Sequence, residues 1–123
     1  MPAAVLIVED EFLVNEMLFR LLSGWGYRVL RAASAEEALA LLKRESADLV
    51  LLDNVLAGMT GMQAMSEVRR LSRAKIMLMT GHYDPEFAKD ARLLGACEVL
   101  AKPLETENLR LALEKALAAG RQA

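Results

Sequence analysis

The sequence is poor in cysteine, proline and aromatic residues, and these shortages limit what the protein can be. Its one cysteine, Cys97, cannot form a disulfide within the chain, which favours a reducing compartment. The few prolines and glycines are scattered, so no flexible linker divides the chain. The formal net charge is only -2 and no run of Lys and Arg occurs. The sequence therefore argues against direct nucleic-acid binding.

The apolar run near the start, Ala3–Val8, is also too limited to act as a targeting or membrane segment. It has no basic start, it ends at three acidic residues, and it is far shorter than a membrane span. We expect a cytoplasmic protein without membrane insertion. The chain has 123 residues, of which 54% are hydrophobic, which is enough for one packed core and too few for two. We therefore expect a single domain over residues 1–123.

Five short apolar runs alternate along the chain with five segments of helical pattern. The first, third and fourth runs are almost entirely apolar, which is typical of parallel strands covered by helices on both faces. The expected strands lie near Ala4–Val8, Arg28–Arg31, Asp48–Leu52, Lys75–Met79 and Glu98–Ala101. Cys97 precedes the last of these strands, and we expect it to be buried and inert.

Helix signals separate these runs. Ser34 and Glu37 form the pattern of a capping box, and Asp84 followed by a proline and an acid opens a later helix. A third helix is expected near Met62–Leu71, and Gly120 is expected to end the last one. Apolar residues at three- and four-residue steps predict one buried stripe on the first helix: Leu13, Val14, Met17, Leu18, Leu21 and Leu22.

Strand–helix alternation repeated five times predicts an α/β fold with right-handed crossovers. We expect a doubly wound (βα)5 sandwich of the flavodoxin-like type, with a parallel five-stranded sheet in the order 2-1-3-4-5. In such folds ligands bind at the carboxyl ends of the strands, so the residues that follow each apolar run are the candidates for chemistry.

Charged and hydroxyl side chains follow four of the five runs. Glu9 and Asp10 follow the first, Asp53 the third, Thr80 the fourth and Lys102 the fifth. Carboxylates held close together repel one another unless a cation is present, and Mg²⁺ suits a site of few carboxylates that also receives a phosphate. A carboxylate can also act as a nucleophile and form an aspartyl-phosphate. Lys102 and Thr80 would then offer a positive charge and a hydroxyl donor to the phosphoryl oxygens.

These residues, in this order, resemble the receiver domains of response regulators over essentially the whole chain. The acidic pair Glu9-Asp10, Asp53 after an apolar strand, Thr80 and the dipeptide Lys102-Pro103 carry the resemblance. A glycine eight residues after Asp53 also falls where the family keeps one.

The resemblance implies a role for each matched residue. Asp53 would be the nucleophile and phosphoacceptor, and Thr80 and Lys102 would contact the phosphoryl oxygens. Asp10 would bind Mg²⁺ directly, with Glu9 assisting through water and the backbone carbonyl of Val55 as a further ligand. The bond between Lys102 and Pro103 would be cis.

The resemblance also implies partners and output. The donor would be a phosphohistidine on a sensor histidine kinase or a histidine phosphotransfer protein. Phosphorylation would shift an equilibrium between conformations and control a downstream protein through the face of the fourth helix, fifth strand and fifth helix. The chain would catalyse its own phosphorylation and dephosphorylation without turning over an external substrate. The sequence leaves open a homodimer and a longer parent protein.

The sequence departs from the family where an aromatic switch residue usually stands. That position is Val99, which has no ring to turn inward. Thr80 is followed by Gly81, His82 and Tyr83, and this loop resembles that of stand-alone receivers associated with HWE-type sensor kinases. Our hypothesis is that this loop carries the conformational response instead.

Three other functions compete with this interpretation. A haloacid-dehalogenase-like phosphatase needs a second Asp two residues after the nucleophile, where this chain has Val55. A nucleotide or flavin module needs a glycine-rich loop after the first strand, where Glu9, Asp10 and Glu11 would instead repel phosphate. A degenerate receiver that acts only as a binding module stays open, although the key residue types are intact.

Overall fold

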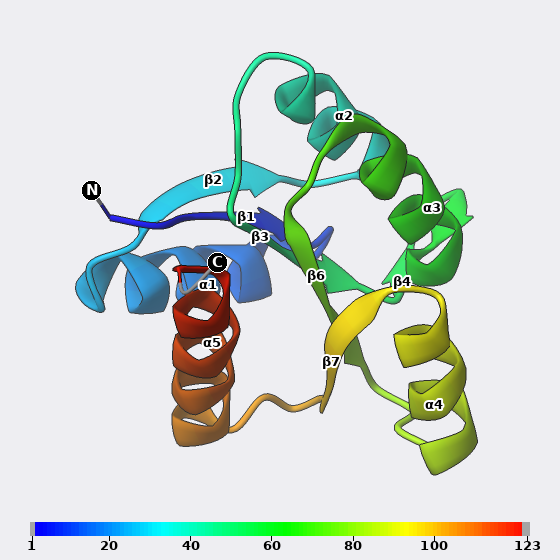
Figure 1. Cartoon of the computed structure of the whole chain (residues 1–123). Coiled ribbons are helices and arrows are strands. Elements are labelled where there is room, and N and C mark those ends of the chain that lie inside the picture. The colour runs from blue at the N-terminus through cyan, green and yellow to red at the C-terminus, as the bar shows by residue number, and fades with distance from the viewer. Residues whose placement is uncertain (1, 122–123) are drawn as a thin grey trace.

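The computed structural model describes the backbone of residues 2–121 and the side chains up to residue 118. Helices and strands alternate along the chain, as Figure 1 shows. The elements are β1 (Ala4–Val8), α1 (Phe12–Gly24), β2 (Arg28–Ala32), α2 (Ala35–Leu42), β3 (Leu49–Asp53), β4 (Val55–Leu56), β5 (Met59–Thr60), α3 (Gly61–Leu71), β6 (Lys75–Thr80), α4 (Pro85–Leu93), β7 (Ala96–Ala101) and α5 (Thr106–Arg121).

The main sheet is parallel and has the order β2-β1-β3-β6-β7. In chain order of its five strands this is 2-1-3-4-5, so the predicted flavodoxin-like topology is confirmed. The pairs around β3 are regular: Val8 of β1 lies beside Leu52 of β3, and Asp53 lies beside Met79 of β6. The pairing of β6 with β7 has one irregularity, between Ile76 and Met77. Because the strands are parallel, their carboxyl ends meet at one edge of the sheet.

Helices cover both faces of this sheet, with α1 and α5 on one side and α2, α3 and α4 on the other (Figure 1). Successive side chains of β1 alternate between the two layers, as strand geometry requires. Val5 and Ile7 pack with Leu18 of α1, whereas Leu6 and Val8 belong to the cluster under α2, α3 and α4. Every residue of β1 and β3 is buried, which explains why these strands are nearly all apolar.

Two features of the loop region after β3 were not predicted. Val55–Leu56 and Met59–Thr60 pair as a small antiparallel hairpin, with Gly58 at a positive φ of 78° in its turn. Thr60 and Gln63 then form a full capping box at the start of α3, since each side chain accepts the other residue's backbone N–H. At α2 the predicted box is only half formed, because Glu37 accepts from Ala33 rather than from Ser34.

The predicted buried stripe of α1 is wrong at two positions. The exposed fractions of Leu13 and Met17 are 78% and 51%, whereas the polar Asn15 is 5% exposed. The helix buries Asn15, Leu18 and Leu22, which are three and four residues apart. The buried face is therefore rotated toward Asn15, whose amide finds backbone partners there.

Cys97 is also placed differently from the expectation that it is buried and precedes the last strand. It lies within β7, which begins at Ala96, and it is exposed. Strand β7 is an edge strand whose pairing with β6 skips Cys97, since Ile76 pairs with Ala96 and Met77 with Glu98. Ala96 and Val99 pack in the same apolar cluster, whereas Cys97 is exposed.

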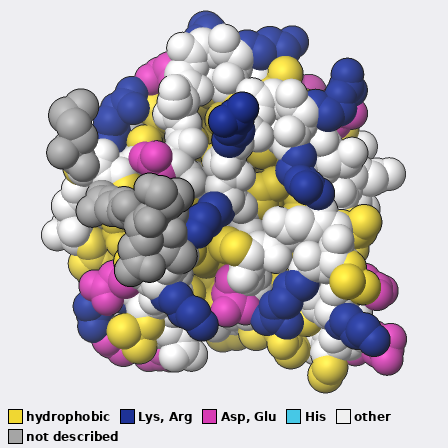
Figure 2. Space-filling view, in the orientation of Figure 1, with side chains coloured by type: hydrophobic (Ala, Val, Ile, Leu, Met, Phe, Trp, Pro, Cys, Tyr) yellow, Lys and Arg dark blue, Asp and Glu magenta, His cyan; other side chains and the backbone are white. Residues whose placement is uncertain are grey.

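The charges on the surface are dispersed. On the face shown in Figure 2, Lys and Arg side chains stand apart from one another with Asp and Glu between several of them, and the hydrophobic side chains show as small separate areas. No helix within residues 2–121 is both long enough and apolar enough to cross a membrane.

Candidate functional site

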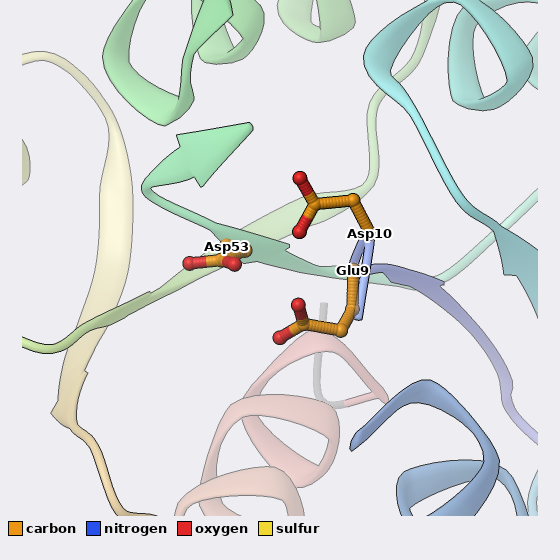
Figure 3. A group of neighbouring side chains, drawn as sticks. All are labelled: Glu9, Asp10 and Asp53. Atoms are coloured by element: carbon orange, nitrogen blue, oxygen red, sulfur yellow. The ribbon is translucent and has the colours of Figure 1, made fainter. Parts of the chain in front are cut away.

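The carboxyl edge of the sheet brings the predicted side chains together. Asp53 is the last residue of β3 and Thr80 the last residue of β6, and Lys102 directly follows β7. Glu9 and Asp10 follow β1, the strand on the other side of β3. Figure 3 shows the Glu9 and Asp10 side chains leaving the end of β1 toward Asp53.

Glu9, Asp10 and Asp53 form a compact acidic cluster. One carboxylate oxygen from each lies within 4.8 Å of the others. Glu9 is completely buried, Asp53 is 5% exposed and Asp10 is exposed at the rim. Three carboxylates at this separation repel one another strongly where the surroundings exclude water. The cluster therefore requires a cation, a proton or both.

Lys102 supplies part of that positive charge. Its Nζ lies 2.7 Å from Glu9 Oε1 and 3.2 Å from Asp53 Oδ2. Burial raises the pKa of the Glu9 carboxyl, and the hydrogen bond from Lys102 opposes this effect without cancelling it. Burial alone would lower the pKa of Lys102, but its contacts with Glu9 and Asp53 raise it. Lys102 therefore stays charged and bridges two of the three acids.

The Asp10 carboxylate differs from those of Glu9 and Asp53, which both contact Lys102. Within residues 2–118, the Asp10 side chain has no hydrogen-bond or ion-pair partner. Three carboxylates and one ammonium leave an excess of two negative charges in a small space. Hard oxygen ligands with an excess of negative charge fit a divalent cation such as Mg²⁺. The cluster could therefore hold a metal ion.

Backbone contacts position the groups around this cluster. Asp53 Oδ1 accepts a hydrogen bond from the backbone N–H of Val55 at 3.2 Å, and Lys102 N–H donates to the Thr80 carbonyl at 2.7 Å. Thr80 is 2% exposed, and its Oγ1 accepts from the backbone N–H of His82 at 3.1 Å. The peptide bond between Lys102 and Pro103 is cis.

The structure shows why a glycine stands at position 61, eight residues after Asp53. A Cβ atom at this position would lie 2.6 Å from Asn54 Cα and 2.9 Å from the carbonyl oxygen of Asp53. Gly61 N–H also donates to the Asn54 carbonyl at 2.7 Å. The start of α3 therefore lies directly against the backbone of Asp53 and Asn54, and only glycine fits there.

We accordingly expect Gly61→Ala to destabilise the protein by about 1–3 kcal/mol, because the clash is with backbone that cannot yield without moving Asp53. The measurement is the free energy of unfolding in urea. Gly24→Ala is the matched control, since nothing lies within 4 Å of a Cβ there and α1 is helical at Gly24. It should be neutral or stabilising. Equal effects of the two substitutions would refute the close-approach explanation.

The predicted switch loop lies beside a groove. Val99 is 4% exposed, whereas Gly81, His82 and Tyr83 are exposed. A groove of about 450 Å³ runs along β7 and α5 and is lined by Tyr83, Val99 and Leu111 among others. Tyr83, the aromatic residue that lines this groove, therefore comes from the loop after β6, whereas β7 contributes Val99.

Residues 5–114 match the model of the response regulator receiver domain.

The chain belongs to the response regulator receiver domain family.

Relatives and structures agree with this assignment. The chain is 39% identical over 115 residues to the transcriptional regulatory protein ZraR of Escherichia coli K12, which covers 93% of this chain and 26% of ZraR. It is 29% identical to sporulation initiation phosphotransferase F of Bacillus subtilis, over 95% of both chains. The receiver domain protein (CheY-like) of Methanospirillum hungatei JF-1 superposes with a TM-score of 0.92 at 27% identity, over 99% of this chain and 98% of that one.

A receiver domain from Clostridium thermocellum gives a TM-score of 0.90 at 28% identity, over 98% of each chain. Receiver domains belong to two-component systems and phosphorelays, generally bind Mg²⁺, and interact with histidine kinases or phosphotransfer proteins and with downstream effectors. The chain spans about a quarter of the length of the ZraR-type relatives it matches.

One polar network beside the receiver's acidic cluster was not predicted from the sequence. Asn15 of α1 is buried and contacts the backbone of Glu9, and Arg31 of β2 contacts Asn15. Asn15 stands within an apolar periodic segment, and an Asn at a position of helical spacing three residues before Leu18 is the signal that identifies it.

Proposed function

We propose that this receiver accepts a phosphoryl group from a phosphohistidine onto Asp53, with Mg²⁺, and changes conformation to control the binding of a partner in the cytoplasm. The supporting observation is the position of the Asp53 carboxylate. It lies at the carboxyl edge of the sheet, 3.2 Å from the Lys102 ammonium and within 4.8 Å of two further carboxylates. A nucleophile, a phosphate-binding cation and a cation-binding cluster thus meet at one place.

In the proposed reaction an oxygen of Asp53 attacks the phosphorus of the phosphohistidine. The new P–O bond forms as the P–N bond breaks, and the imidazole leaves with the electron pair of that bond. Val55 N–H holds one Asp53 oxygen at 3.2 Å, which orients the carboxylate. Lys102 and the Thr80 hydroxyl would contact the phosphoryl oxygens, whose charge needs stabilisation during transfer.

Mg²⁺, when bound, would neutralise negative charge between the acidic cluster and the incoming phosphoryl group. Asp10 is its best direct ligand, because its carboxylate is exposed and unpaired within residues 2–118. Glu9 would assist through water, since its Oε1 and Oε2 are already held by Lys102 and by the Glu11 N–H. Asp53 and the backbone carbonyl of Val55 would complete the set of protein oxygens.

The test is to incubate the chain with acetyl phosphate or phosphoramidate, with Mg²⁺ or with EDTA, and to measure its intact mass. A Mg²⁺-dependent gain of one phosphoryl group supports the proposal. The same gain from a phosphorylated histidine phosphotransfer protein would identify the donor class. A folded, Mg²⁺-bound chain that gains nothing from any of these donors would instead favour the alternative, a degenerate receiver that binds partners without phosphorylation.

We further propose that the Gly81–Tyr83 loop carries the conformational response. Val99 is a buried valine, so no ring at that position can turn. The His82 N–H donates to Thr80 Oγ1, and a Thr80 hydroxyl that turns toward a phosphoryl group must alter this contact. The loop ends at Tyr83, which borders the groove between β7 and α5. A downstream protein, or a second copy in a homodimer, would bind the face of α4, β7 and α5.

Phosphorylation is therefore expected to shift the backbone amide resonances of Gly81, His82 and Tyr83 more than those of the turn at Gly26. The measurement is an amide correlation spectrum of ¹⁵N-labelled protein before and after phosphorylation. Gly26 lies in the turn after α1 and serves as an internal reference. If the loop resonances stay in place while those of α5 move, the loop hypothesis is wrong.

A further inference from the structure

Asn15 makes an unusually complete set of contacts for a buried amide. Its Nδ2 donates to the carbonyl of Glu9 at 3.0 Å and to the carbonyl of Ala32 at 3.1 Å. Its Oδ1 accepts from Nε of Arg31 at 2.7 Å. The partners fix the orientation of the amide, because carbonyls only accept hydrogen bonds and a guanidinium only donates them. Asn15 therefore links β1, α1 and β2.

Arg31 is itself held from two sides. Its Nη1 lies 3.0 Å from Glu16 Oε1, and its guanidinium lies 4.8 Å from the centre of the Phe19 ring. Asn15 and Arg31 border a hollow of about 190 Å³ that also reaches Glu9 and Asp10. The network thus lies directly beside the acidic pair, toward β2, whereas Lys102 follows β7 at the other edge of the sheet.

The hydrogen bond from Asn15 to the Glu9 carbonyl also bears on the position of Asp10, the next residue. The Glu9 carbonyl and the Asp10 N–H belong to one planar peptide unit, so fixing the carbonyl fixes the direction in which Asp10 leaves β1. Helix α1 does not fix this turn by itself: Glu11 at its N-cap makes no side-chain cap, and the first turn has no acidic residue. The Asp10 side chain has no partner of its own within residues 2–118.

We infer that Asn15 is a positioning residue for the metal site: it holds the Glu9–Asp10 peptide so that the Asp10 carboxylate faces Asp53, and Arg31 holds Asn15 in the orientation that does so. The inference rests on the proposed Mg²⁺-dependent function. It explains why a polar residue takes a buried place on α1 while Leu13 and Met17 remain exposed.

The test compares Asn15→Leu and Arg31→Gln with the unaltered protein. Mg²⁺ affinity is measured by calorimetry, well below the melting temperature of each variant. We expect Asn15→Leu to weaken Mg²⁺ binding about tenfold, as happens when a group that orients a metal ligand is lost. Arg31→Gln should weaken it in the same direction by a smaller factor. Arg28→Gln is the control, because Arg28 lies on the same strand and, among residues 2–118, its side chain pairs only with Glu45, 2.6 Å away.

A second readout does not need the metal. In EDTA, Asn15→Leu should speed hydrogen exchange at the Glu9 and Glu11 amides, which donate to the Ala32 carbonyl and to Glu9 Oε2 at 3.1 Å each, while leaving those of β6 protected. Mg²⁺ affinity that stays within twofold in both variants, with unchanged exchange at Glu9 and Glu11, would overturn the inference and leave Asn15 a purely structural residue. If the unaltered protein itself binds no Mg²⁺, the proposed function fails, and exchange at Glu9 and Glu11 alone decides whether Asn15 holds the turn. Arg31→Gln keeps the test valid if Asn15→Leu does not fold.

Discussion

Asp53→Asn is expected to abolish the Mg²⁺-dependent gain of a phosphoryl group. The substitution keeps the size of the side chain and leaves an oxygen that can accept the Val55 N–H, but it removes the nucleophilic carboxylate. It also removes one of the three negative charges of the acidic cluster, so Mg²⁺ binding should weaken by about tenfold or more. Intact mass after treatment with phosphoramidate measures the first effect, and calorimetry measures the second.

Asp48→Asn is the matched control for this substitution. Asp48 lies just before the opposite end of β3, where its Oδ2 accepts from the Ala4 N–H at 2.7 Å. This variant should gain the phosphoryl group like the unaltered protein. A gain that persists in Asp53→Asn would place the phosphoacceptor elsewhere, with Asp10 as the next candidate because its carboxylate is exposed.

Lys102→Met is expected to move two properties in opposite directions. The phosphorylation rate at saturating Mg²⁺ should fall by about two orders of magnitude, because a donor aimed at the developing phosphoryl charge is lost. Mg²⁺ affinity of the resting protein should instead rise, on the order of tenfold, because the ammonium that bridges Glu9 and Asp53 no longer repels the metal. Methionine keeps most of the length of the side chain without its charge.

A lower phosphorylation rate together with a higher Mg²⁺ affinity distinguishes this explanation from damage to the fold, which would lower both. Lys89→Met is the control, since Lys89 is an exposed residue of α4 that makes no ion pair within residues 2–118. Neither property should change in that variant. If Mg²⁺ affinity falls in Lys102→Met, then Lys102 holds Glu9 in the geometry that binds the metal and does not compete with it.

These two residues were predicted from the sequence because of their place after apolar strands. Parallel strands that are covered on both faces must be apolar, so the first charged residue marks the point where each strand leaves the core. Asp53 and Lys102 satisfy this description, and register between strands brings such positions to one edge. What the pattern could not predict is that Lys102 contacts Glu9 more closely than it contacts Asp53.

The errors arose where local pattern and tertiary contacts disagree. Leu13 and Met17 fit the periodicity of a buried stripe, yet they are exposed because α1 is rotated to bury Asn15. Cys97 was expected to be buried because cysteine usually is, but it faces outward on an edge strand. The β4–β5 hairpin is only two residues on each side and has too little alternation to be recognised.

The sequence by itself determined the fold class and the residues that meet at the carboxyl edge of the sheet, because these follow from hydrophobic periodicity, chirality and strand ends. Spacing along the chain does not fix the order of the strands, which the tertiary structure decided. The tertiary structure alone decided which face of α1 is buried and how the Glu9–Asp10 turn is held. The physical reason is that burying a side-chain amide is favourable only where the amide finds hydrogen-bond partners. The partners of Asn15 are Glu9, Arg31 and Ala32, and the last two belong to β2, which only the folded structure brings next to α1.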